Sequence, residues 1–430
     1  MNKDKKTEGS ITTYFKYLII VLIFVQILDS FTTSFPTMIP SEIINEFLSH
    51  FEENIATSIF ALVTGIATIG MYVCSLNQYL SDKFGRKIML IITVFGMAIV
   101  SLLIVFSQSI IDFTIYLFLL WFFTRSDIWL IYINEEAPQG KRAFWTNMVL
   151  IVGMIGVILA PVLRSIFITE SVSNWRAIPL FTVILGFSLG LLLLFTLKDT
   201  KFYKEMKELN NDLGKEQKGK VSFRANFKLM MGSANKTQLI VLMVMSFIMG
   251  INSIFRNLVE QLLSSNPSLV PSQVNIVLII ASASVIFAFI IMGTLADKLG
   301  RIPLLYAFAI IIPIARLIVV LGSVYPQAAY ILSIFGGGLS EIGYWGEWVL
   351  ISMMILELVP TESRGTGSGL KSLFAGIGIT IGFFLSSLIT VLMSLEATFI
   401  ILSLLIVINI YLIYKYLRET KHIDLKNVYK

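Results

Sequence analysis

The chain has 430 residues, of which 56% are hydrophobic and only 14% charged, and its mean hydropathy is +0.83. Soluble domains carry about 25% charged residues, so this composition excludes an ordinary soluble protein and predicts an integral membrane protein. The net charge of +6 comes from basic residues in short loops between apolar runs, which argues against nucleic-acid binding, and the single cysteine excludes an internal disulfide.

Twelve apolar runs follow one another along the chain, each close to the roughly 20 residues that cross a bilayer core of about 30 Å. Because the runs are continuously apolar rather than alternating, they indicate helices and not a β-barrel. The sequence therefore predicts an all-α membrane protein with twelve transmembrane helices. The expected spans are 17–38, 55–80, 88–107, 112–133, 144–167, 176–197, 237–257, 272–296, 303–323, 327–355, 368–391 and 394–417.

The lysines and arginines predict the orientation of these spans. If the N-terminus is cytoplasmic, all but five of the 33 basic residues fall in the inner segments, and the first outer loop, residues 40–54, has none. This asymmetry is the positive-inside pattern. We therefore expect a multi-pass protein of the cell membrane with both termini in the cytoplasm.

A lysine-rich polar segment, residues 198–236, separates the first six spans from the last six. We interpret it as a cytoplasmic linker with some attraction to anionic lipid headgroups. It divides the chain into an N-terminal six-helix bundle, residues 1–197, and a C-terminal six-helix bundle with a short tail, residues 237–430.

The two halves repeat one another at three places. "LSDKFGRK" (80–87) recurs as "LADKLGRI" (295–302), "EEAPQGKR" (135–142) as "ELVPTESR" (357–364), and "LKDTK" (197–201) as "LRETK" (417–421). Each pair lies at the inner end of matching helices, about half the chain apart. Internal repeats of this kind are a design of transporters and predict two pseudo-symmetric bundles.

At these motifs the chain resembles the major facilitator superfamily. "GTLADKLGR" (293–301) matches the family's loop motif in full, and the first copy departs from it at Gln78. The resemblance covers all twelve helices, and the paired Glu-x-x-Pro-x-x-x-Arg segments resemble the sugar-porter and organic-ion branches. It implies a monomeric secondary transporter that works by alternating access, without a cofactor.

The repeated motifs also indicate an inner gate. Glycine permits the tight turn of the loop motif, and the resemblance implies that the charged residues around it hold the inner helix ends together. Interfacial anchoring of the helices is the alternative. The expected gating residues are Asp82, Gly85, Arg86, Glu135 and Arg142 in the first half, and Asp297, Gly300, Arg301, Glu357 and Arg364 in the second.

A second group of charged residues lies inside the predicted spans. Arg125 is ten residues from Glu135, hence about 15 Å deep at 1.5 Å per residue, and a charge there requires a partner or a wet cavity. The repeat offset carries position 125 onto Glu347, at a similar depth on the tenth helix. By resemblance, helices 1, 4, 7 and 10 line the central path.

These observations define a candidate site for substrate and proton. Arg125 would hold an anionic group, and Asp29 or Glu347 would carry the proton. The alternatives are a structural ion pair for the charges, ordinary packing for the aromatic residues, interfacial anchoring for Arg256, and a structural or snorkelling role for Arg316. The candidate residues are Asp29, Arg125, Asp127, Glu341, Glu347, Trp129, Tyr132 and Trp345.

The sequence contains no metal-ligand spacing, cofactor motif or phosphate-binding loop, so we expect no cofactor and no enzymatic activity. We predict proton-coupled movement of a small organic anion or similar polar metabolite. Sugar or polyol uptake is the alternative, although the seventh helix lacks the paired glutamines typical of sugar porters. Drug efflux by antiport is a third possibility, and a membrane nutrient sensor on a transporter scaffold is the alternative from another class.

Overall fold

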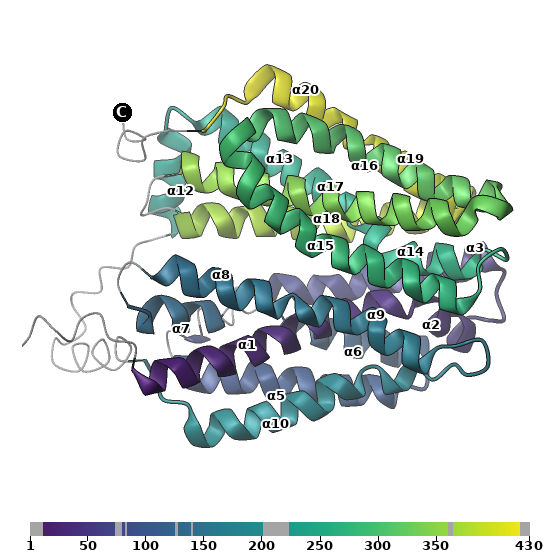
Figure 1. Ribbon diagram of the computed structural model, residues 1–430, viewed down its shortest axis with the longest axis horizontal. Coiled ribbons are helices and arrows are strands. Elements are labelled where there is room, and N and C mark those ends of the chain that lie inside the picture. Colours follow the sequence, from purple (N-terminus) through teal and green to yellow (C-terminus); the bar gives the residue numbers. More distant parts are fainter. Residues whose placement is uncertain are drawn as a thin grey trace, which may run out of the picture. The chain divides into compact units, whose positions relative to one another are not determined.

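The computed structural model of the chain is almost entirely helical (Figure 1). It describes residues 12–73, 80–81, 84–124, 128–138, 141–200, 223–359 and 364–421. Within these ranges, the one pairing of extended residues is an isolated bridge between Ile168 and Ser173. The predicted all-α class is confirmed.

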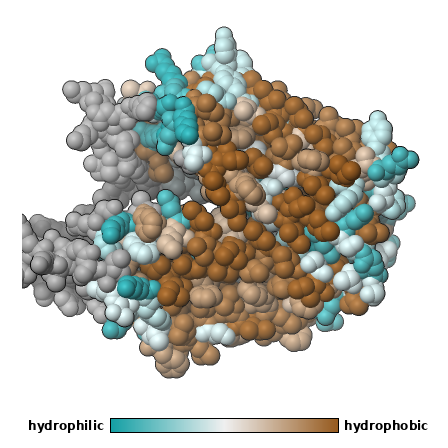
Figure 2. Space-filling model, in the orientation of Figure 1, coloured by the Kyte–Doolittle hydropathy of each residue, from teal (hydrophilic) through white to brown (hydrophobic). Residues whose placement is uncertain are grey.

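Eleven helical spans in the described ranges are long and apolar enough to cross a membrane. A further long helix, α17 (Ala329–Leu358), occupies the predicted tenth span, and it is not one of the eleven because glycines, glutamates and aromatic residues interrupt its apolar sequence. Figure 2 shows hydrophobic side chains over the outer sides of the helices and hydrophilic groups near the helix ends. Such a surface suits contact with lipid hydrocarbon.

The helices gather into two compact units. Unit 1 consists of Met1–Pro36, Ile69–Phe167 and Asn174–Gly219. Unit 2 consists of Thr37–Thr68, Ile168–Ser173 and Lys220–Lys430. Unit 2 therefore combines the second half of the chain with the segment that follows the first helix.

In unit 1, the first helix packs against the two helices of the predicted fifth span. The helices are α1 (Thr13–Ser34), α5 (Arg86–Val105), α6 (Ile110–Phe123), α7 (Ile128–Glu136), α8 (Arg142–Gly153), α9 (Ile155–Phe167) and α10 (Leu180–Thr196), with the 3-10 turn η4 (Trp175–Ala177). α1 contacts α8 and α9, whereas α5 contacts α6 and α10. A Cβ on Gly156 of α9 would lie 2.3 Å from the carbonyl oxygen of Ile27 on α1, so only glycine allows this approach.

In unit 2, α17 packs between α15 and α16, and α18 packs against α13 and α3 (Figure 1). A Cβ on Gly378 of α18 would lie 2.2 Å from the carbonyl oxygen of Phe247 on α13, which repeats the close approach of α9 to α1. The helices besides α17 are α2 (Pro40–Phe47), α3 (Glu53–Ala67), α12 (Phe223–Gly232), α13 (Lys236–Asn252), α14 (Ile254–Ser265), α15 (Pro271–Leu299), α16 (Arg301–Val324), α18 (Arg364–Leu392), α19 (Leu395–Leu404) and α20 (Val407–Tyr416). The remaining 3-10 turns of the chain are η2 (Phe35–Met38), η3 (Thr68–Val73) and η6 (Pro326–Ala328).

Polar contacts accompany the packing of α3 on α18. The Ser58 hydroxyl donates to the carbonyl oxygen of Ser387 at 2.8 Å, and the hydroxyls of Thr68 and Thr380 lie 2.8 Å apart. A Cβ on Gly65 would lie 2.8 Å from the Cβ of Phe383. The second predicted span is thus held against α18 by hydroxyl pairs and by a close backbone approach.

Four predicted spans are each formed by two α-helices where we expected one continuous helix. The fourth span consists of α6 and α7, the fifth of α8 and α9, the seventh of α13 and α14, and the twelfth of α19 and α20. The seventh also continues to Ser265, beyond the predicted end at residue 257. In the sequence, the polar residues Glu260 and Gln261 interrupt the apolar pattern beyond residue 257. In the structure, both side chains are nevertheless buried in unit 2.

The predicted outer loop 40–54 contains the short helix α2, whose first turn is bound by a distant carboxylate. Glu260 of α14 is fully buried and accepts hydrogen bonds from the backbone N–H of Ser41 at 2.9 Å and from its hydroxyl at 2.5 Å. A carboxylate at a helix N-terminus satisfies free N–H groups and interacts favourably with the helix dipole. Because Glu260 is 219 residues away from Ser41, local sequence patterns did not predict α2.

Replacing Glu260 with alanine should destabilise unit 2. The change leaves the buried N–H and hydroxyl of Ser41 without this acceptor, at a cost of about 1–3 kcal/mol. Thermal unfolding of the purified protein in detergent measures the effect. The exposed Glu52, which caps no helix through its side chain, gives the matched control Glu52→Ala. Equal melting temperatures for the two variants would contradict this role of Glu260.

Candidate functional site

One face of α17 carries a row of polar and aromatic side chains. Glu341, Trp345, Trp348 and Ser352 follow one another at spacings of four, three and four residues, which places them on one side of the helix. The indole N–H of Trp345 donates to Glu341 Oε2 at 3.1 Å, and the rings of Trp345 and Trp348 lie 6.4 Å apart. We call these four residues the α17 stripe.

Two basic side chains from other helices lie over the indole rings of the α17 stripe. The guanidinium of Arg256 on α14 is 5.1 Å from the ring centre of Trp345. Lys371 Nζ on α18 is 3.6 Å from the ring centre of Trp348 and donates to Ser352 Oγ at 2.5 Å. A cation over an indole face is stabilised by about 0.5–2 kcal/mol, most strongly when desolvated.

Neither basic residue was predicted to belong to a site. Arg256 was expected to anchor α14 at the interface, but it lies against Trp345 of the α17 stripe. Lys371 was counted among the inner basic residues, yet only 5% of its surface is exposed. Its contacts in the described part of the chain are a hydroxyl and an aromatic face, with no carboxylate among them. Lys371 is therefore a buried basic side chain without an acidic counter-ion in that part.

Arg316 supports the α17 stripe through the break between α13 and α14. It is 2% exposed, and its guanidinium donates to Asn252 Oδ1 at 2.5 Å, to the Asn252 carbonyl oxygen at 2.8 Å and to Ser340 Oγ at 3.3 Å. The carbonyl belongs to the last turn of α13, where helical partners run out. Arg316 therefore fixes the start of α14, which carries Arg256, and these contacts favour the structural role that the sequence predicted as one possibility.

Glu347 lies on another face of α17. It is fully buried, and its Oε1 accepts a hydrogen bond from Asn409 Nδ2 of α20 at 2.7 Å. The structure therefore brings Glu341 and Trp345 together and separates them from Glu347.

The candidate residues of unit 1 are only partly described. Arg125 and Asp127 lie outside the described residues. Asp29 is half-buried on α1. Trp129 and Tyr132 pack in the hydrophobic core of unit 1 together with α1, α5 and α10, and the Tyr132 hydroxyl donates to the Lys198 carbonyl oxygen at 3.2 Å. These contacts favour the packing alternative for both aromatic residues.

The gating residues form the same arrangement in both units. In unit 1, Arg86 Nη2 binds Glu135 Oε1 at 3.0 Å and Nη1 donates to the Ser81 carbonyl oxygen at 3.1 Å. The Thr200 hydroxyl donates to the other oxygen of Glu135, and Asp199 Oδ1 accepts from the N–H of Lys87 at 2.9 Å.

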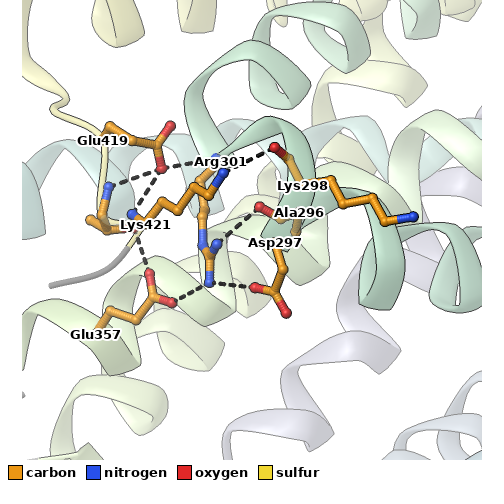
Figure 3. Close-up of polar contacts among 8 residues, drawn as sticks. Ala296, Asp297, Lys298, Arg301, Glu357, Glu419 and Lys421 are labelled. Carbon is orange, nitrogen blue, oxygen red and sulfur yellow. Dashed lines mark hydrogen bonds and ion pairs between the residues drawn. The ribbon is translucent and has the colours of Figure 1, made fainter.

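Unit 2 repeats each of these contacts (Figure 3). Arg301 Nη2 binds Glu357 Oε1 at 2.8 Å, and its Nη1 donates to the Ala296 carbonyl oxygen at 2.9 Å. The Thr420 hydroxyl donates to Glu357 Oε2 at 2.5 Å, and Glu419 accepts from the N–H of Arg301 at 3.0 Å. The third sequence repeat, "LKDTK" and "LRETK", thus supplies an acid that caps a helix and a threonine that holds the central glutamate.

We call the two arrangements the clasps. Gly85 and Gly300, directly before α5 and α16, have φ of 107° and 97°, which is the conformation that favours glycine at the predicted turns. Asp297 pairs with Arg301 at 3.1 Å. Asp82 lies outside the described residues, as do the side chains of Arg142 and Arg364, which begin α8 and α18. Asp199, Thr200, Glu419 and Thr420 were missed as members, although the sequence repeat already marked them.

The family follows from the sequence itself. The model of the Major Facilitator Superfamily matches residues 18–343 and again 240–427. The chain belongs to the Major Facilitator Superfamily. It is a transporter and not an enzyme, and the twelve predicted spans agree with the superfamily fold. A sequence search of curated proteins finds no match.

Solved structures of other transporters share this fold. A D-xylose–proton symporter superposes with a TM-score of 0.75 at 17% identity, covering 95% of this chain and 99% of that one. The inward-open xylose transporter XylE from E. coli gives 0.73 at 17% identity, with 96% and 98% covered. A mutant of the nucleoside transporter NupG gives 0.74 at 13% identity, with 93% and 100% covered. At these identities the likeness shows the fold alone.

The clasp of unit 2 should depend on pH through Glu419. Burial raises the pKa of this carboxyl, but hydrogen bonds from four backbone N–H groups outweigh it, so the pKa lies below its ordinary value. A lowered pKa means that the stabilisation is present above the unfolded-state value of about 4.3 and is lost as the pH falls through the folded value.

Two variants of Glu419 test this dependence. Thermal unfolding should show that Glu419→Ala loses on the order of 1 kcal/mol at neutral pH. Glu419→Gln keeps an acceptor but cannot titrate, so it should lose less and should flatten the decline of the melting temperature below about pH 4. An unchanged acid-side decline in Glu419→Gln would show that other carboxyls cause it.

Proposed function

We propose that this transporter moves a small organic anion together with protons by alternating access. The observation that supports the substrate class best is the α17 stripe, where Arg256 and Lys371 lie over two indole rings beside one carboxylate. Two basic side chains against one carboxylate favour a negatively charged solute. The indole faces favour one with a planar or ring-shaped part.

The rest of the cycle is proposed from the sequence and the superfamily. Arg125 and Asp127 would contribute from the fourth helix, and Asp29 would exchange the proton from the first. The halves 1–197 and 237–430, joined by the linker 198–236, would move against one another, with the clasps at their cytoplasmic ends. We place the protein in the cell membrane as a monomer with both termini in the cytoplasm.

Sugar uptake is the second candidate, favoured by one observation. Trp345 and Trp348 offer ring faces of the kind on which sugars stack, and the Glu341 carboxylate could accept hydrogen bonds from hydroxyl groups. Lys371 supports the first candidate, because a buried basic side chain without an acidic counter-ion among the described residues favours an anionic substrate and offers a neutral sugar less.

Replacing Lys371 with glutamine should reduce uptake of organic anions about tenfold to a hundredfold, which is the loss of a charge-assisted interaction of about 1.5–3 kcal/mol. A panel of organic acids and neutral sugars in liposomes with an imposed pH gradient measures the effect. Lys415→Gln, on the exposed surface of α20, is the matched control. Uptake of sugars but not acids would select the second candidate, and unchanged acid uptake in Lys371→Gln would refute the assigned role of the α17 stripe.

Replacing Asp29 with asparagine should remove a proton carrier without removing the substrate site. Uptake driven by the pH gradient should therefore fall severalfold, whereas exchange of labelled for unlabelled substrate at equal pH should continue, because exchange needs no net proton movement. The ratio of the two rates in the same liposome preparation measures this. If Asp29→Asn lowers both rates equally, Asp29 does not act as the coupling group.

A further inference from the structure

Glu347 and Asn409 form a buried pair that the α17 stripe does not use. Both residues are fully buried, and a single hydrogen bond of 2.7 Å joins Asn409 Nδ2 to Glu347 Oε1. The pair connects α17 to α20, and α20 itself packs mainly against α16 and α13. It therefore lies inside the helix packing of unit 2, on a face of α17 away from the stripe.

Two oxygen atoms of this pair have no hydrogen-bond donor in the described part of the chain. They are Glu347 Oε2 and Asn409 Oδ1, and both are buried. An ionised carboxylate can only accept, so neither oxygen can satisfy the other while Glu347 is charged. Each buried unsatisfied acceptor costs about 1–3 kcal/mol, and more when it is charged.

One proton on Glu347 would satisfy both oxygens. A neutral carboxylic acid and a primary amide are complementary, because the acid O–H can donate to the amide oxygen while the acid carbonyl accepts from the amide N–H. The second of these bonds is the one observed. Turning the Asn409 amide over would place two acceptors 2.7 Å apart and would call for the same proton.

The surroundings of Glu347 offer little support for its charged form. The hydrophobic core of unit 2 includes Phe308 and Ile312 of α16 and Ile406, which directly precedes α20. Arg316 of α16 is the charged group that acts on Glu347, but it is not within ion-pair distance and already binds Asn252 and Ser340.

The other helices packed here bring no closer counter-charge in the described residues. On α20, Tyr411 and Lys415 are exposed and interact with each other. α13 carries its one charged residue, Lys236, at its first position. A carboxylate at Glu347 would thus keep one strong hydrogen bond and lose its hydration, which is a costly state for a buried charge.

We propose that Glu347 and Asn409 form a proton-binding site between α17 and α20, in which the bound proton stabilises the packing of the two helices. Release of the proton leaves a carboxylate that needs further donors, and water supplies them only when this packing opens. Because α17 also carries the stripe, proton binding at Glu347 biases the position of the substrate helix without contact with the substrate. This last step rests on the proposed function, whereas the proton site itself does not.

Infrared difference spectroscopy of the full chain in lipid tests the proton site without knowledge of the substrate. At neutral pH the carbonyl stretch of a protonated carboxylic acid should be present, should disappear in Glu347→Gln and should remain in the control Glu53→Gln at an exposed position. Asn409→Leu should shift this band to higher frequency, because the acid loses its amide partner. Absence of a band that depends on Glu347 would overturn the proposal.

Transport measurements then test the coupling. Glu347→Gln can make both hydrogen bonds with Asn409, so it should fold and should behave as if permanently protonated at this site, with substrate uptake that responds less to a pH gradient than that of the wild type. An unaltered response to the gradient, together with the expected infrared band, would overturn the coupling step and leave the proton site standing. Failure of the wild type to transport any organic anion would refute the proposed function instead, since the infrared result does not depend on it.

Discussion

A charged side chain inside an apolar helical span is stable only beside a group that replaces its hydration. In the described part of unit 2, each deeply placed charge has such a group. Arg316 has the amide and carbonyl of Asn252, Lys371 has a hydroxyl and an indole face, and Glu341 has the indole N–H of Trp345. None of these partners is an opposite full charge, so the charges are held in place without being neutralised.

The interior of unit 2 differs in this respect from the clasps, where charged side chains do pair with opposite charges. In both clasps a full ion pair forms between arginine and glutamate, and a second acid satisfies the N-terminus of the next helix. The clasps are duplicated contact for contact, as is the glycine approach that joins α9 to α1 and α18 to α13. The α17 stripe has no described counterpart in unit 1. Duplication therefore preserves the framework, while the residues that would recognise a substrate have diverged.

The fold could be predicted because it depends on features that are local in sequence. Run length, continuous hydropathy and the three repeats are enough to predict helices, their number and the family. Glu341 and Trp345 could be predicted as neighbours because a spacing of four residues places them on one helix face. The acid and the threonine of "LKDTK" and "LRETK" stand out as a repeat in the sequence, but only the structure shows what they do. In each clasp the acid caps a helix and the threonine hydroxyl donates to the central glutamate.

The missed residues depend on information that hydropathy does not contain. Lys371 sits close enough to a helix end to look like an interfacial residue, and only the rotation of α18 turns it onto Trp348. Asn409 is a neutral side chain in an apolar run, so nothing in its neighbourhood marks it as the partner of Glu347. The repeat offset predicted that Glu347 matches Arg125 in position along the helix, but position along a helix does not determine which face a residue occupies.

The packing of α3 on α18 has a consequence for biosynthesis. Ser58 and its partner Ser387 are 329 residues apart, so α3 is synthesised and inserted long before α18 exists. Until α18 is inserted, the hydroxyl groups of α3 and its backbone at Gly65 must contact lipid, water or another helix instead. Assembly of unit 2 therefore requires α3, a helix that is synthesised well before the rest of that unit. A chain that started at the linker would lack α3 and its packing surface for α18.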